Sequence, residues 1–212
     1  MVEVIFQYTY TDVNAELVRV CENLQQAESH TDLEVEVTPS RRGEMATMIV
    51  SLRDGLASVY AHKYASIGTP HLPHLRLDVG DRRFAHLDQE ADPTVVKDTI
   101  DLVAEIYLAT EERPAFVYGM AKKMPGVLSD LDDYPVDASQ RGQAVTEINF
   151  LTWLSIFPPP LVDTYGRERL LSAPAWHVEE LDDGSILLVE WADPTVIRDN
   201  EVQQHLGFDP EE

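Results

Sequence analysis

The first part of the chain alternates short apolar runs with amphipathic segments. Residues 2–10 are rich in β-branched and aromatic side chains and therefore predict a strand. Apolar positions that recur every three to four residues, with Asp12 as a cap, predict a helix over about 13–28. Further strands are predicted at about 33–38, 46–52, 56–62 and 74–79. This order favours an antiparallel sheet with a helix packed on one face.

The middle of the chain adds one more amphipathic helix and one more strand. The helix is predicted to begin at Pro93, with Asp92 as its cap, and the strand covers 115–119. Residues 120–143 are polar and contain prolines and glycines, which indicates an exposed loop. The strongly apolar residues 146–157 are expected to form a helix that Pro158 ends.

The C-terminal third carries the clearest turn signal. Asp182-Asp183-Gly184 stands between apolar runs at 175–181 and 185–191, which predicts a β-hairpin. Helices are predicted on either side of it, at about 160–171 and 194–206. The chain as a whole predicts an α+β fold: a mostly antiparallel sheet with helices packed on it and a C-terminal helix–helix–β-hairpin–helix unit. We expect a single domain over 1–212, with possible halves at 1–120 and 140–212 joined by the exposed loop.

The charge of the chain indicates its environment. Asp and Glu number 38 against 16 Lys and Arg, for a net charge of −22, which is typical of a protein from an extreme halophile. Nucleic-acid binding is not expected, because phosphate contacts need clustered basic residues. The chain has no apolar run long enough to cross a membrane and no basic N-terminal region of a signal peptide, so a cytoplasmic location is expected.

Known catalytic and cofactor motifs are absent from the sequence. It has no Gly-rich phosphate-binding motif and no GxSxG motif, so no cofactor is expected. Cys21 is the one cysteine, which excludes an intramolecular disulfide and a Cys-based zinc site. His71 and His74 are weak candidates for metal ligands, since no metal-ligand spacing surrounds them. A metal-dependent hydrolase would have to use them together with His62, His86 and Asp78.

The segment from Trp153 to Pro174 combines aromatic residues with a triple proline. One interpretation is a core helix, a rigid turn and a second amphipathic helix. The other is a rigid surface for a protein partner, because such groups lose little entropy on binding. The candidate partner-binding residues are Trp153, Phe157, Tyr165, Arg167, Arg169, Trp176 and His177.

The same region carries a resemblance to a known family. The order of WLSIF, PPPLV, YGRERLLSAPA and DDGSILLV resembles the C-terminal half of immunity proteins from polymorphic-toxin systems. The resemblance implies an α+β protein that binds and neutralises a cognate toxin without catalysing a reaction. We therefore expect a non-enzymatic, partner-binding protein, with an immunity-type inhibitor as its specific form. A structural or assembly subunit of a virus or large complex and the metal-dependent hydrolase are the alternatives.

Overall fold

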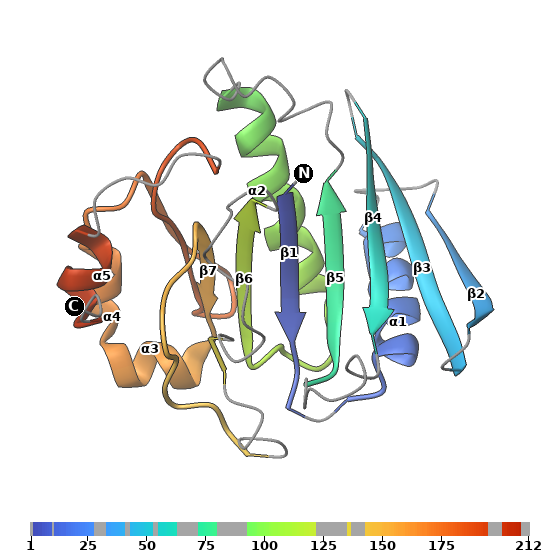
Figure 1. The fold of residues 1–212 in the computed structure, drawn as a ribbon, viewed down its shortest axis with the longest axis horizontal. Helices are drawn as coiled ribbons and strands as arrows, with labels where there is room; N and C mark the ends of the chain where they lie inside the picture. The colour runs from blue at the N-terminus through green and yellow to red at the C-terminus, as the bar shows by residue number, and fades with distance from the viewer. Residues whose placement is uncertain are drawn as a thin grey trace.

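A nine-stranded antiparallel sheet forms the centre of the protein (Figure 1). The computed structural model describes residues 2–9, 11–27, 33–40, 43–52, 55–62, 72–79, 93–121, 135–136, 143–194 and 201–208. Along the chain the strands are β1 (Val2–Gln7), β2 (Glu34–Ser40), β3 (Gly43–Leu52), β4 (Gly55–His62), β5 (His74–Val79), β6 (Phe116–Ala121), β7 (Leu154–Phe157), β8 (His177–Glu180) and β9 (Ile186–Val189). Their order in the sheet is β2-β3-β4-β5-β1-β6-β7-β9-β8, so the N-terminal strand lies at its centre.

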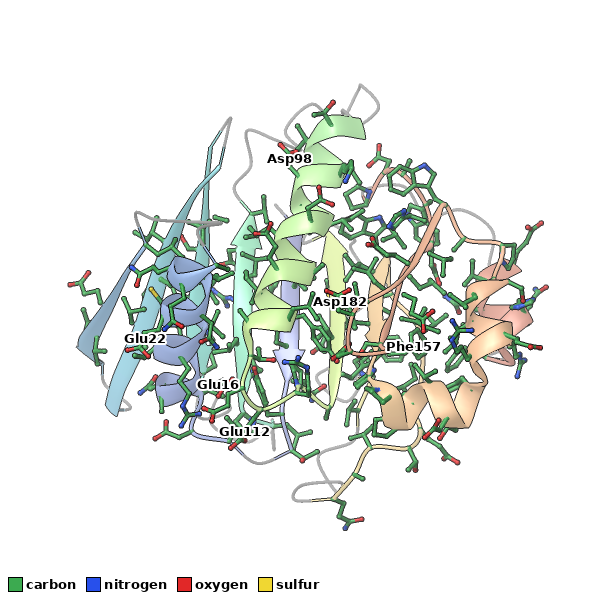
Figure 2. All side chains as sticks on the ribbon, turned by 180° about the vertical axis from the view of Figure 1, so that it is seen from behind. Glu16, Glu22, Asp98, Glu112, Phe157 and Asp182 are labelled. Carbon is green, nitrogen blue, oxygen red and sulfur yellow. The ribbon has the colours of Figure 1, made fainter. Side chains whose placement is uncertain are left out.

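Helices cover the two faces of this sheet at different places. The helices are α1 (Val13–Gln26), α2 (Pro93–Ala109), α3 (Pro159–Tyr165), α4 (Arg167–Leu171) and α5 (Glu201–Leu206). Figure 2 shows α1 and α2 on one face, where Val4 and Phe6 of β1 join the larger apolar cluster. Ile5 points to the opposite face and belongs to the second cluster, which includes Leu161 of α3, Leu170 of α4 and Val202 of α5.

A buried carboxylate connects α1 to the segment between α2 and β6. Glu16 is fully buried, and its Oε1 accepts hydrogen bonds from the backbone N–H groups of Glu111 at 2.7 Å and Glu112 at 3.2 Å. Its Oε2 lies 2.8 Å from Nη1 of Arg19. The helix therefore provides both the carboxylate and the cation that balances it, and it holds the start of β6 in place through this contact.

The predicted α+β fold and the antiparallel sheet are confirmed. The strands expected in the first 80 residues, both long helices and the hairpin around Gly184 are present. No helix in the described part of the chain is both long and apolar enough to cross a bilayer.

The helix predicted over 146–157 is wrong. Residues 154–157 form β7, which pairs with β6 on one side and with β9 on the other. Ile156 belongs to one apolar cluster and Phe157 to the other, so this strand is buried on both faces. A continuous apolar run is typical of such a strand and cannot be distinguished from a buried helix by periodicity.

The two C-terminal helices also differ from the prediction. The helix expected at 160–171 is divided into α3 and α4 at Gly166, whose φ of 87° lies in the left-handed region. The last helix is described from Glu201 to Leu206, and residues 195–200 lie outside the described part of the chain.

Candidate functional site

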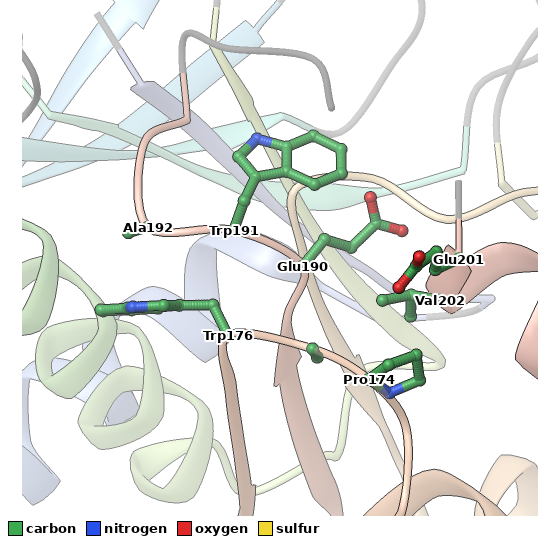
Figure 3. A pocket seen from close by; sticks show the side chains of 8 residues that line it. Pro174, Trp176, Glu190, Trp191, Ala192, Glu201 and Val202 are labelled. Atoms are coloured by element: carbon green, nitrogen blue, oxygen red, sulfur yellow. The ribbon is translucent and has the colours of Figure 1, made fainter. Parts of the chain in front are cut away.

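A pocket of about 250 Å³ lies where the chain leaves β9 (Figure 3). Its walls come from the segment before β8, the segment after β9 and the start of α5. The lining residues are Pro174, Ala175, Trp176, Glu190, Trp191, Ala192, Glu201 and Val202. The pocket therefore combines two indoles with two carboxylates, and none of its described lining residues is basic.

Hydrogen bonds continue the strand pairing into this pocket and fix its floor. The backbone N–H of Glu190 donates to the carbonyl oxygen of Trp153 at 2.9 Å, and the N–H of Trp176 donates to the carbonyl oxygen of Glu190 at 3.1 Å. The indole Nε1 of Trp153 donates to the carbonyl oxygen of Trp191 at 2.7 Å. All three tryptophans of the chain therefore hold or line this one site.

Glu190 is the unusual residue of the pocket. Its side chain is buried, with 6% of the residue exposed, and the carboxylate has no ion-pair partner among the described residues. Burial raises the pKa of this carboxyl to about 7, and the side chain of Gln203 opposes part of the rise. Figure 3 shows the carboxylate extending toward Glu201 and Val202 at the start of α5.

Trp176 forms the open rim of the pocket. It is 44% exposed, more than a tryptophan in a core would be, and its ring lies at a tilt 6.1 Å from that of His177. In Figure 3 the indole of Trp176 and the carboxylate of Glu190 point to opposite sides, so the exposed ring lies at the rim and not beside the carboxylate.

Two of the predicted partner-binding residues are buried and cannot form a surface. Trp153 is 3% exposed and Phe157 is 0% exposed, so the prediction that they contact a partner is wrong. Tyr165 is half-buried, with its ring 5.7 Å from that of Phe157 and 5.4 Å from that of Phe208. These three rings stabilise the packing of α3 against the sheet and the C-terminus.

The two arginines of α4 are exposed but already have partners inside the protein. Arg167 forms an ion pair with Glu180 of β8, with its Nε 3.0 Å from Oε1. Arg169 donates from Nε to the carbonyl oxygen of His205 at 2.8 Å and so connects α4 to α5. Of the predicted partner-binding residues, Trp176 and its neighbour His177 remain at the surface near the pocket. Nε2 of His177 lies 3.2 Å from Oε2 of Glu179.

The histidine candidates do not form a metal site in the described part of the chain. His62 and His74 lie opposite each other on β4 and β5 with ring centroids 5.0 Å apart, and Nδ1 of His74 is 3.1 Å from the carbonyl oxygen of Leu72. Asp78 pairs with Arg76 at 2.9 Å. No group of three His, Cys, Asp or Glu side chains suited to a metal is found among these residues. His71 and His86 lie outside the described residues.

The sequence prediction missed Glu190. The available signal was an acidic residue inside the apolar run Ile186–Trp191. Because the chain has 38 acidic residues, one more acid next to a strand did not indicate burial.

Comparisons with known proteins found no relative of this chain. No family model, no curated protein and no solved structure matches the chain.

Proposed function

We propose that this chain is a non-enzymatic protein that binds a basic protein partner and takes one cationic side chain of that partner into the Glu190 pocket. The observation that carries the proposal is the buried Glu190 carboxylate, which has no ion-pair partner among the described residues and lines a pocket with an exposed tryptophan at its rim. A lysine or arginine side chain supplies the charge that this site lacks.

The energetics favour such a ligand. An isolated buried carboxylate is costly, and burial raises the pKa of Glu190 to about 7, which disfavours its ionised form. A cation within about 4–6 Å would reverse this preference, because opposite charges at that distance favour the ionised carboxylate.

The surroundings of the pocket favour a protein over a free amine. Trp176 is an exposed aromatic residue of the kind that dominates binding energy at protein interfaces. Exposed acids on β8 extend the negative surface beside it, as at Glu179. The net charge of −22 adds no long-range attraction at molar salt, where the Debye length is about 3 Å, so selection of a basic partner depends on charges in near contact.

Immunity-type inhibition in the cytoplasm of a halophile is the specific form of this proposal. The order of motifs between Trp153 and Val189 supports the immunity-type form, and the acidic composition supports only the halophilic setting. In this form the partner is a basic toxin, and the cationic side chain is one that the toxin needs for its own activity.

The first test uses small cationic probes on the purified protein. N-acetyl-lysine methylamide and N-acetyl-arginine methylamide should shift the NMR signals of the Trp176 indole in a saturable way, and neutral N-acetyl-glutamine methylamide should not. Replacing Glu190 by Gln should weaken this binding about tenfold or more, since the carboxylate is the charge that holds the probe. Tetramethylammonium distinguishes a free-amine site, because it should bind as tightly as the amino-acid probes only in that case.

The second test captures the partner from host cells at their native salt. The tagged wild type should retain one basic protein in stoichiometric amount, and the variants Glu190→Gln and Trp176→Ala should lose it. Glu179→Gln is the matched control, because this acid lies on β8 outside the pocket lining and is exposed. Retention of the partner by both pocket variants would refute the proposal. Capture of further copies of this chain alone would favour the assembly-subunit alternative.

A further inference from the structure

A reciprocal pair of hydrogen bonds connects the short helices α4 and α5, which lie side by side in Figure 1. Nε of Arg169 in α4 donates to the carbonyl oxygen of His205 in α5 at 2.8 Å. The carbonyl oxygen of Arg169 lies 2.9 Å from Nε2 of His205 and accepts the return bond. Each basic side chain therefore satisfies a carbonyl in the last turn of the other helix, where carbonyls lack partners within their own helix.

The end of α5 leaves room for the guanidinium of Arg169. Gly207 follows the helix with a φ of 84°, in the left-handed region. A Cβ at this position would lie 3.1 Å from Nη2 of Arg169. The absence of a side chain at Gly207 therefore allows the close approach between the two helices.

The contact fixes geometry and does not balance a charge. Arg169 has no ion-pair partner among the described residues, although the chain carries 38 acidic residues. Its Nε donates instead to a backbone carbonyl of α5. Arg167 of the same helix differs, because it forms an ion pair with Glu180 of β8.

The other end of α5 forms a wall of the Glu190 pocket. Glu201 and Val202 line the pocket, and the side chain of Gln203 hydrogen-bonds to the Glu190 carboxylate. The helix has six residues, so at 1.5 Å per residue it is about 9 Å long. A helix this short is not stable alone, so its position depends on the contacts that hold it. A change at its C-terminal end therefore reaches the pocket wall.

We infer that Arg169 is a positioning residue of the Glu190 pocket: by holding the C-terminal end of α5, it keeps Val202 and Gln203 against the buried carboxylate. The consequence for binding rests on the proposed function, whereas the consequence for the Glu190 carboxyl group does not. A role in stability alone would leave the pocket of the folded variant unchanged.

The first test is a ¹³C NMR titration of the Glu190 carboxyl group in the full-length protein at high salt. Burial is the largest cause of the raised pKa, so water that enters beside a displaced α5 should lower this pKa from about 7 toward 4.5 in Arg169→Met. Arg167→Met is the matched control, because it removes the same charge from the same helix without touching α5. It should keep the wild-type pKa of Glu190. A wild-type pKa in Arg169→Met as well would overturn the inference.

Gly207→Ala tests the same contact from the side of α5 and without a change of charge. Its methyl group would lie 3.1 Å from Nη2 of Arg169, and a φ of 84° strains an alanine. The NMR signal of the Arg169 Nε–H reports whether the bond to His205 is lost. The pKa of Glu190 should fall with it, and this variant decides the question if Arg169→Met does not fold. Loss of the bond with an unchanged pKa would refute the positioning role.

The affinity for N-acetyl-lysine methylamide separates this inference from the proposed function. Arg169→Met should bind the probe about tenfold or more weakly than the wild type, and Arg167→Met should bind it equally well. Arg169→Lys should recover part of the affinity, because an ammonium group also donates to a carbonyl oxygen. If the wild type binds no probe, the proposed function fails, while the titration of Glu190 still decides the role of Arg169. Equal affinity of Arg169→Met and a wild type that binds would overturn the inference.

Discussion

At the scale of single residues, Glu190 makes stability depend on pH. Its pKa is raised from 4.5 to about 7 in the folded protein, so between these values the folded state keeps a proton that the unfolded state has released. Stability therefore falls as pH rises through this interval, by up to about 3 kcal/mol. The variant Glu190→Gln removes the effect. Urea unfolding at high salt should show that the free energy of unfolding of the variant, relative to that of the wild type, increases from about pH 4.5 to about pH 8.

The measurement should compare the free energy of unfolding of Glu190→Gln with that of the wild type at each pH. The comparison is needed because His62 makes the stability of both proteins change with pH in the opposite direction. Burial and the nearby charge of Arg76 lower the pKa of His62 from 6.5 to about 4. Between about pH 4 and pH 6.5 the unfolded state binds a proton at His62 that the folded state does not, so this residue makes stability rise with pH. The two contributions partly cancel in the wild type. A difference between Glu190→Gln and the wild type that does not change with pH would show that Glu190 is ionised and compensated in the folded protein.

At the scale of elements, the contact between α1 and the segment before β6 depends on Glu16. Replacing Glu16 by Ala leaves two backbone N–H groups and the Arg19 guanidinium without this buried acceptor. We expect a loss of about 2–4 kcal/mol in the free energy of unfolding, since unsatisfied buried donors are costly. Hydrogen exchange at the amides of Glu111 and Glu112 should quicken as well.

Glu22 supplies the control on the same helix. It is exposed, so Glu22→Ala should change stability by less than about 0.5 kcal/mol. Equal effects of the two substitutions would mean that the loss reflects the charge of the helix, not the buried contact.

Local signals explain which elements could be predicted from sequence. The hairpin at Asp182–Gly184 depends on a left-handed glycine, with φ of 82° at Gly184, and this requirement is visible in the residue type. β7 depends on pairing with β6 and β9, and its partner residues in β6 lie more than 30 positions away in the sequence. No local pattern reveals such partners. Trp176 could be selected for its type, whereas the role of Glu190 arises from burial that the tertiary structure creates.

At the scale of the whole molecule, the net charge of −22 should make the fold depend on salt. Acidic groups spread over the surface repel one another, and the chain has only 16 Lys and Arg to offset them. The Debye length falls from about 10 Å at 0.1 M to about 3 Å at 1 M, so added salt removes most of the repulsion. The melting temperature should therefore rise by about 10 °C between low and molar KCl.

The way in which the melting temperature changes with KCl concentration distinguishes charge screening from other effects of salt. Screening should act mainly below about 0.5 M, where the Debye length changes most, whereas a general salting-out of apolar surface would keep rising at molar salt. KCl and tetramethylammonium chloride at equal ionic strength should stabilise alike if screening dominates. A melting temperature independent of KCl would contradict the halophilic interpretation. Molar salt also screens the long-range attraction between this acidic protein and a basic partner. Only a charge in near contact could then select the partner. A buried carboxylate in a pocket provides such a contact, whereas acids scattered over the surface do not.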